Sequence, residues 1–387
     1  MKMRILHICT SGEYTEGFSY QDNLLTKYMA KQGWDVYLIA SPLAYDENGK
    51  TIKLPVPQSY VNKDGVKVTR LPYNKPEKLG YKLRSMKGFY QQLEEIKPDV
   101  IYIHLPQTSD SGVVIKYLKK HPNVKLYCDN HADFSNSATN WVSKTILHGV
   151  LWKYYIQRLN KYAEVFYGVL PARVEFLKNV YGLPANRCEL LVMGGDDELV
   201  EAAAKPEIRH ALRSEYGLSD DDFVVMTGGK IDPWKTQTIL LMKAVKNIQN
   251  PKLKLIVFGS VDESLQEQVA ELCDEKKIQY IGWVKSADSY QYFAAADLVV
   301  FPGRHSVFWG QVAAQGIPML CKWWDGTDDV DLGGNVHFLT KDSVEEIQSE
   351  IQHLLDSPED YKKMKRIAVE KGMKEYSYAD IARRAVK

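Results

Sequence analysis

Short apolar runs alternate with amphipathic segments along the first half of the chain. The runs at 4–10, 35–41, 99–105, 125–131 and 165–170 have the length and apolar content of buried strands. Between them lie segments with apolar residues every three or four positions, which predict helices over 20–33, 82–97, 111–121, 139–162 and 173–182. Strand, helix and strand in succession predict a parallel sheet with helices on both faces.

The same alternation starts afresh in the second half. Apolar runs at 223–228, 254–260, 279–283, 298–303, 317–322 and 336–339 predict strands, and segments at 236–248, 264–277, 286–296 and 310–316 predict helices. The turn-rich region between 186 and 205 separates the two halves. We therefore expect two doubly wound, Rossmann-like α/β domains at 1–195 and 196–387, with the last helix a candidate to pack back on the first domain. Such sheets bind ligands beyond the carboxyl ends of their strands, so we expect a central cleft there.

Composition narrows the class of protein. The chain has 387 residues and a formal net charge of +1, which argues against nucleic acid as a partner. Five scattered cysteines form neither a disulfide framework nor a zinc motif. The first residues lack the apolar run of a signal peptide, and no window reaches the length of a membrane span. We expect a cytoplasmic protein.

One stretch departs from this even charge. Residues 67–87 carry seven Lys or Arg side chains and a single acidic one, Glu77, interleaved with Leu and Tyr. Such a stretch fits either a solvated loop and helix face or a segment that docks on an anionic membrane surface. The second alternative would place the protein at the inner face of the cell membrane.

The candidate chemistry begins at residues 228–237, GGKIDPWKTQ, between a predicted strand and a predicted helix. Glycines followed by a helix start receive anions in α/β proteins, and Lys230 and Lys235 add positive charge. The segment lacks the spacing of a P-loop. The first strand is followed only by Gly12 and Gly17 rather than a G-x-G-x-x-G run, which argues against a dinucleotide oxidoreductase.

The second half resembles the donor-binding domain of family 4 glycosyltransferases, which are retaining enzymes of the GT-B fold. The resemblance rests on GGKIDPWK, IVFGS and the run YIGWVKSADSYQYFAAADLVVFPGRHSVFWGQVAAQGIPM. The first half is similar through its glycine-bearing loop after the first strand, YCDNHADFSNS and LLVMGGDD. This likeness implies a nucleotide-sugar donor, most simply a UDP-sugar, and a surface-polysaccharide, lipid-linked or protein-linked glycan acceptor.

The resemblance assigns roles to individual residues. Lys230 stands where the family has an arginine and Lys235 where it has a lysine, and these two cations, with Gly229, would clamp the diphosphate. His131 corresponds to a histidine beside the donor sugar, flanked here by Asp129 and Asp133. The catalytic candidates are therefore His131, Lys230 and Lys235, and Gly12 and Gly17 join the donor-binding candidates.

The segment 302–316 completes the implied phosphate site. Ser306 is expected to cap a short helix, so that His305, Ser306 and the N–H groups of Val307, Phe308 and Trp309 meet phosphate oxygens. Gln311 stands at the family's ribose-binding glutamate, on the cleft, and Gly310 beside it is not acidic either. A glutamate there would bind ribose hydroxyls more tightly than the amide does.

Three alternatives stay open at this level. The first is a glycosyltransferase, the second is a GT-B sugar-nucleotide epimerase, and the third is a non-catalytic, glycosyltransferase-like partner subunit, suggested by the missing glutamates. The acidic triplets at 220–222 and 329–331 imitate a metal-binding D-x-D pair. Because GT-B enzymes use cations and helix ends instead, we expect no metal and no other cofactor.

Overall fold

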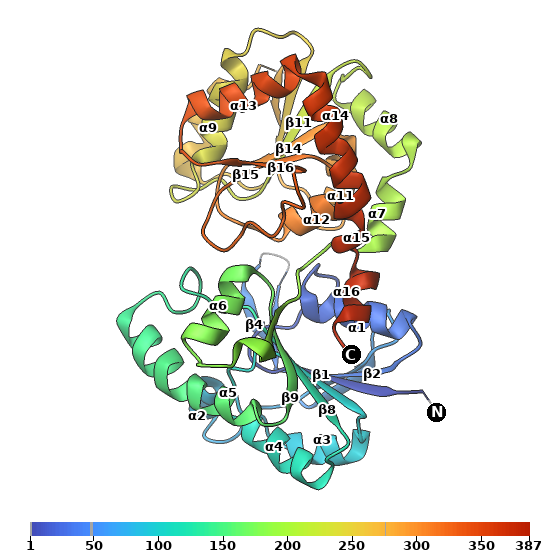
Figure 1. Cartoon of the computed structure of the whole chain (residues 1–387), viewed down its shortest axis with the longest axis vertical. Helices are drawn as coiled ribbons and strands as arrows, with labels where there is room; N and C mark the ends of the chain where they lie inside the picture. The colour runs from blue at the N-terminus through green and yellow to red at the C-terminus, as the bar shows by residue number, and fades with distance from the viewer. Residues whose placement is uncertain (1, 47–48, 275) are drawn as a thin grey trace. The chain divides into compact units, whose positions relative to one another are not determined.

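The computed structural model describes residues 2–46, 49–274 and 276–387. The chain divides into two compact units, the first formed by residues up to Val192 together with Ile381–Lys387, and the second by Met193–Asp380. Each unit has its own sheet, flanked by helices (Figure 1), and its own apolar core. The predicted fold class, two Rossmann-like α/β domains, is confirmed.

The sheet of the first unit has the strand order β10-β9-β8-β7-β1-β2-β6-β5. All neighbouring strands are parallel except β5, which pairs antiparallel with β6. A separate antiparallel pair is formed by β3 and β4. The bounds are β1 Arg4–Cys9, β2 Asp35–Ala40, β3 Leu43–Tyr45, β4 Thr51–Lys53, β5 Gln58–Val61, β6 Lys67–Arg70, β7 Val100–His104, β8 Lys125–Asn130, β9 Ala163–Gly168 and β10 Cys188–Leu190.

The helices of the first unit are α1 Gln21–Lys31, α2 Glu77–Leu83, α3 Phe89–Ile96, α4 Ser111–Lys120, η1 Ser143–Trp152, α5 Lys153–Leu159, α6 Pro171–Asn179 and the short η2 Ala185–Arg187. The single helix predicted over 82–97 is wrong. The chain leaves α2 at Arg84 with a left-handed φ of 53°, and Gly88, with φ 81°, precedes α3. Two left-handed residues within five positions interrupt the apolar period that suggested one helix.

The long helical section predicted over 139–162 is present, but its first part, η1, is a π-helix that continues into α5. At the other end of the chain, α16 (Tyr378–Arg384) crosses from the second unit into the first. There the carbonyl of Lys387 accepts a hydrogen bond from Tyr127 Oη at 2.7 Å. The C-terminal segment is thus tied to β8 of the first sheet.

The sheet of the second unit is parallel throughout, with the order β13-β12-β11-β14-β15-β16. Its strands are β11 Phe223–Gly228, β12 Leu253–Phe258, β13 Ile278–Tyr280, β14 Leu298–Phe301, β15 Met319–Lys322 and β16 Val336–Leu339. Its helices are α7 Asp197–Ala203, α8 Pro206–Glu215, α9 Gln237–Asn247, η3 Glu263–Leu265, α10 Gln266–Leu272, α11 Ser289–Ala295, α12 Phe308–Ala314, α13 Val344–Asp356, α14 Pro358–Ile367, η4 Ala368–Gly372 and α15 Met373–Glu375.

In each sheet the order of the parallel strands reverses at a central strand, and this reversal positions the candidate sites. In the first sheet β1 lies between β2 and β7, and in the second β11 lies between β12 and β14. The loops that leave the two strands at such a reversal go to opposite faces, which opens a crevice at the carboxyl end of the sheet. The loops after β1 and β7, and those after β11 and β14, are therefore where each unit can receive a ligand.

Candidate functional site

The turn after β11 is held close to the turn after β12 by glycines. The N–H of Gly229 donates to the carbonyl of Phe258 at 3.0 Å, and Gly229 has φ 141°. A Cβ on Gly259 would lie 1.8 Å from the Gly229 carbonyl oxygen. Only glycine permits this backbone contact, so the turn carries its lysines on a fixed frame.

The two lysines of that turn have different surroundings. Nζ of Lys230 lies 3.4 Å from Oδ2 of Asp232. Lys235 is exposed and makes no ion pair within the described residues. Asp232 also organises the turn, because its Oδ1 accepts from the Trp234 N–H at 2.9 Å and its carbonyl accepts from the Lys235 N–H at 2.8 Å.

The turn after β14 lies at the same reversal of the sheet, since β11 and β14 are paired. A Cβ on Gly303 would lie 3.4 Å from the side-chain oxygen of Gln237, the first residue of α9. The expectation that Ser306 caps the next helix is wrong, because Val307 holds the cap position without a side-chain bond. The Trp309 N–H donates to the Ser306 carbonyl at 3.1 Å, so it is not available to a phosphate as predicted.

Gln311 is buried rather than displayed on a cleft. Its side chain is 2% exposed, and Nε2 donates to Oγ of Ser289 at 2.7 Å. A Cβ on Gly310 would meet the Met193 carbonyl oxygen at 2.0 Å, so steric contact excludes an acidic side chain there. The expected exposed position of Gln311 is therefore wrong, while its contact with ribose stays a prediction.

Exposed tryptophans follow three strands of the second sheet. Trp234 comes after β11, Trp283 after β13, and Trp323 and Trp324 after β15, with exposed fractions of 83%, 67%, 47% and 39%. Parallel strands end at one edge, so all four side chains belong to the carboxyl edge of this sheet. Flat exposed rings at such an edge can stack on a nucleobase or a sugar. The sequence reasoning assigned no role to these residues.

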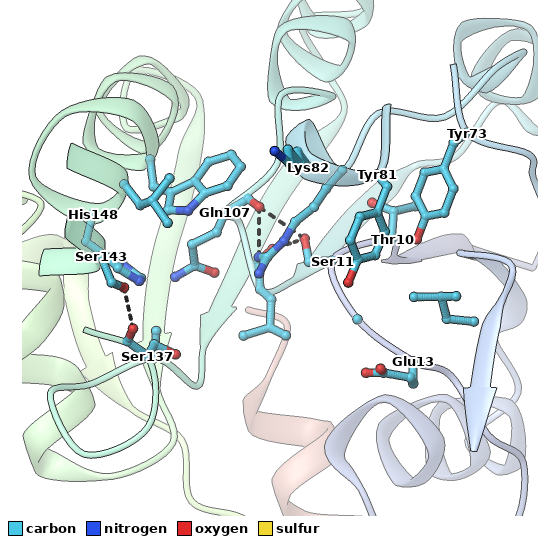
Figure 2. A pocket seen from close by; sticks show the side chains of 17 residues that line it. Thr10, Ser11, Glu13, Tyr73, Tyr81, Lys82, Gln107, Ser137, Ser143 and His148 are labelled. Carbon is cyan, nitrogen blue, oxygen red and sulfur yellow. Dashed lines mark hydrogen bonds between the residues drawn. The ribbon is translucent and has the colours of Figure 1, made fainter. Parts of the chain in front are cut away.

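The first unit contains a cavity of about 670 Å³ at the reversal of its own sheet. The loop after β1 contributes Thr10–Glu13 and the loop after β7 contributes Leu105 and Gln107. Figure 2 shows Tyr73 and Tyr81 on one side of the cavity, Ser143 and His148 on the other, and Ser11 and Gln107 between them. Aromatic rings and hydroxyl groups that converge on one cavity are the lining expected for a sugar.

The cavity also carries positive charge. Lys82 and Arg84, at the end of α2, line it. The Arg84 guanidinium donates to the Gln107 carbonyl at 2.9 Å and lies 5.3 Å from the centre of the Trp152 ring. Glu13 lines the same cavity, so its lining combines both signs.

His148 is held in the neutral form on this wall. Its Nδ1 lies 2.7 Å from Tyr181 Oη, and burial, reinforced by the nearby Arg84 cation, lowers the pKa of His148 to about 4. A neutral imidazole at neutral pH contributes a hydrogen-bonding group without a further charge.

His131 follows β8 and belongs to a cluster on buried strands of the first unit. Its Nε2 lies 3.2 Å from Oδ1 of Asp129, and Oδ2 of Asp129 lies 2.7 Å from Nδ1 of His104. Nε2 of His104 in turn lies 2.9 Å from Nδ1 of His7. Although burial alone would raise it, the two neighbouring histidines, His104 first, hold the pKa of Asp129 well below its usual range.

The described residues contain no group of three or more His, Cys, Asp or Glu side chains that could hold a metal ion. Among the same residues, no helix combines the length and apolar character that crossing a membrane requires.

Two family models match consecutive parts of the sequence. Residues 23–199 match Glycosyltransferase Family 4, and residues 208–371 match Glycosyl transferases group 1. The first match falls on the unit with the His131 cluster and the second on the unit with the lysine turn. The chain is a glycosyltransferase of the GT-B type.

Relatives of this glycosyltransferase are distant in sequence. An uncharacterized glycosyltransferase from Methanocaldococcus jannaschii is 22% identical over 283 residues, 70% of each chain. Among solved structures, a glycosyltransferase from Rickettsia africae has a TM-score of 0.69 at 13% identity, covering 99% of this chain and 96% of that one. Anabaena HepE in complex with UDP has a TM-score of 0.66 at 18% identity, covering 99% and 98%. UDP-GlcNAc 2-epimerase from Neisseria meningitidis also shares the fold, with a TM-score of 0.64 at 11% identity over 100% and 98%.

The predicted site residues of the glycosyltransferase do not gather in one place: His131 follows β8 outside the cavity lining, and Gln311 is buried within α12. Gly229, Lys230, Lys235, His305, Ser306 and Val307 lie at the reversal of the second sheet. In the first unit Gly12 lines the cavity, while Gly17, with φ 81°, lies in the same loop outside its lining. Sequence reasoning missed His7 and His104, and the only available signal was that both are polar residues within apolar strands.

Proposed function

We propose that this glycosyltransferase moves a glycosyl residue from a nucleotide-sugar, most simply a UDP-sugar, to a surface-polysaccharide, lipid-linked or protein-linked glycan acceptor, with retention of configuration at the transferred carbon. The observation that carries the donor part is the turn with Lys230 and Lys235 at the reversal of the second sheet. UDP in the Anabaena structure supports a uridine nucleotide.

In this proposal the two lysines stabilise the leaving group. Breaking the bond between sugar and diphosphate places negative charge on the departing phosphate, and fixed cations there lower the barrier. Lys235 would carry most of this effect, since Asp232 already neutralises part of the Lys230 charge. His305 and Ser306 would hold the same phosphates from the next turn, and a tryptophan of the exposed set would stack on the base.

The acceptor would bind in the cavity of the first unit. Tyr73 and Tyr81 offer ring faces for a sugar, and Lys82 and Arg84 suit an acceptor with a phosphate or a uronic acid. Retention would proceed by front-face attack, in which the leaving phosphate takes the proton of the acceptor hydroxyl. We assign no enzymic nucleophile.

The first unit would also dock on an anionic membrane. An apolar-basic face, formed by α2 and residues 141–158, exposes Leu79, Tyr81, Trp141, Val142, Ile146, Val150 and Tyr154 at 48–70%. No acidic residue occurs from 134 to 163 or from 78 to 93. Arg84 over Trp152 connects the two segments. Exposed rings beside uncompensated cations fit the boundary of anionic lipid.

Calorimetric titration with UDP, GDP and ADP tests the donor site, and release of the nucleotide from the matching sugar donors tests transfer. We expect micromolar binding of one nucleoside diphosphate and donor turnover that rises when a glycan acceptor is added. Absence of binding by all three nucleotides would contradict the proposal and favour the partner-subunit alternative.

The epimerase alternative is tested with UDP-GlcNAc alone, because such an enzyme needs no acceptor and releases an epimeric nucleotide-sugar. Proton NMR of the reaction mixture distinguishes the epimeric nucleotide-sugar from unreacted UDP-GlcNAc directly. We expect no epimer.

A further inference from the structure

In the cluster of His7, His104, Asp129 and His131, the hydrogen-bond contacts determine how many ring nitrogens of the histidines carry a hydrogen. His7 lies on β1, His104 on β7 and Asp129 on β8, all within hydrogen-bonding reach of a neighbour. At its inner end, Nε2 of His7 lies 3.3 Å from the sulfur of Met29 on α1. At its outer end, His131 is 25% exposed at its side chain.

Three contacts of the two inner histidines each need one hydrogen on a ring nitrogen. A thioether sulfur only accepts, so His7 Nε2 must donate to Met29. An ionised carboxylate only accepts, so His104 Nδ1 must donate to Asp129. One more hydrogen must lie between His7 Nδ1 and His104 Nε2, which are 2.9 Å apart.

Two neutral imidazoles carry two ring hydrogens, and these contacts need three. We infer that the His7–His104 pair carries one permanent positive charge, located on His104, and that this buried cation neutralises Asp129 so that Asp129 positions His131 without drawing a proton onto it. His104 is the closer ring to the carboxylate, at 2.7 Å. This makes His7, His104 and Asp129 positioning residues. It rests on the proposed glycosyl transfer and on the place beside the donor sugar that the family resemblance gives His131.

The surroundings agree with a charge on His104 rather than His7. Burial lowers the pKa of His104, but the Asp129 carboxylate outweighs it and the pKa is raised. Burial, then the neighbouring His104, holds the pKa of His7 well below its ordinary value. The Tyr102 ring lies 4.9 Å from the His104 ring, so the cation also meets an aromatic face.

Among the described residues, the other ionisable groups around the cluster include Asp22 on α1, Tyr102 on β7, Cys9 on β1 and Cys128 on β8. Burial, reinforced by nearby carboxylates, raises the pKa of both thiols, which keeps them neutral. Burial raises the pKa of Asp22 and that of Tyr102, which favours the neutral form of both. Oδ1 of Asp129 makes no aligned hydrogen bond within the described residues. The carboxylate oxygen that faces His131 is thus available to its Nε2–H, which leaves Nδ1 to accept a hydrogen bond.

The proton count is measured by NMR of the full chain with ring-¹⁵N-labelled histidine, without any substrate. We expect one histidine to keep both ring nitrogens protonated from pH 6 to pH 9, and to disappear from the spectrum of His104→Gln. The surface variant His210→Gln is the matched control and should leave that signal in place. A spectrum in which His104 is neutral at pH 7 would overturn the inference.

Function is tested by the pH dependence of turnover in His104→Gln. Glutamine can still donate to Asp129 but carries no charge, so the carboxylate would now favour a protonated His131. We expect the acidic limb of the turnover profile to move up by about one pH unit, with nucleotide affinity unchanged. An acidic limb at the same pH as in the parent would contradict the positioning role. If the parent protein itself binds no nucleotide, the proposed function is contradicted instead.

Met29→Leu provides a second variant that conserves volume and removes only the sulfur acceptor. The third ring hydrogen is then no longer required, so the doubly protonated signal should begin to titrate at least one pH unit lower than in the parent. If Met29→Leu leaves the signal unchanged, the argument from the sulfur contact is wrong.

Discussion

Nζ of Lys230 lies 3.4 Å from Oδ2 of Asp232, whereas Lys235, five positions later on the same turn, has no carboxylate partner within the described residues. The sequence presents the two lysines as a pair, but the Asp232 carboxylate offsets part of the positive charge of Lys230 and not that of Lys235. This difference separates their expected roles at a diphosphate.

Lys235→Ala should lower turnover about a hundredfold, because one fixed group on a developing charge has an effect of that order. Nucleotide-sugar affinity should change much less, since the charge is needed most in the transition state. Steady-state kinetics with the donor identified by calorimetry measure both. Lys252→Ala, at the opposite edge of the sheet, is the control, and an unchanged turnover in Lys235→Ala would contradict the role. Lys230→Arg should be tolerated.

Asp232→Asn should tighten binding of the nucleoside diphosphate about threefold to tenfold. The amide oxygen can still accept from the Trp234 N–H, so the turn is kept, while the negative charge beside Lys230 is removed. Titration calorimetry at low and high salt measures the change, and the gain should shrink at high salt. Weaker binding at both salt concentrations would place the diphosphate elsewhere.

Binding to vesicles with anionic lipid should fall severalfold when Lys78 and Lys82 are changed to Glu, and also when Trp141 and Val150 are changed to Ser. Both pairs belong to the apolar-basic face, one supplying charge and the other apolar contact. Lys119 and Lys120 changed to Glu, at the end of α4, are the matched control. Co-sedimentation at two salt concentrations measures binding. An equal loss of binding in the control would mean that only the net charge of the protein matters, and not the apolar-basic face.

His148 should make the fold sensitive to acid. Its pKa is lowered to about 4 in the folded protein, by burial and then by Arg84, so below pH 6.5 the unfolded chain takes up a proton that the folded chain does not. The contribution of His148 to the free energy of unfolding is therefore fully present above pH 6.5 and is lost as the pH falls toward 4. His148→Gln should lose less melting temperature than the parent between pH 7 and pH 4.5, by at least about 2 °C. Thermal melts followed by circular dichroism measure the melting temperature at each pH, with His353→Gln as control. An equal fall of melting temperature with pH in His148→Gln and in the parent would contradict the prediction.

Gln311→Glu should destabilise the second unit. Ser289 Oγ already donates to the Ser286 carbonyl at 2.7 Å and accepts from Gln311, so a carboxylate would face an oxygen with no hydrogen to offer. We expect the free energy of unfolding to fall by about 1–3 kcal/mol. Urea denaturation measures it, with the less buried Gln315→Glu as control. Tighter nucleotide binding without loss of stability would restore the sequence-based expectation for this residue.

The sequence by itself determined the fold class and the lysine turn. Period-two and period-3.6 patterns report which side chains must be buried, and glycines after a strand report where the backbone has to turn tightly. These are local properties, so β1, β2, β7, β8 and β9, the strands of the second sheet and the turn at 228–237 could be read from single segments. The short strands β5, β6 and β10 of the first sheet were not predicted. The helix predicted over 82–97 failed because the left-handed residue Arg84 leaves no mark on an apolar period.

Only the tertiary structure decided which distant residues meet. His7, His104 and Asp129 are far apart along the chain and come together because β1, β7 and β8 are adjacent strands. Gln311 is buried against Ser289, and position 310 must be glycine because the Met193 carbonyl lies against it. Neither contact can be read from the pattern of residues along the chain. Burial and hydrogen bonding are set by neighbours in space, and strand order, not sequence distance, chooses those neighbours.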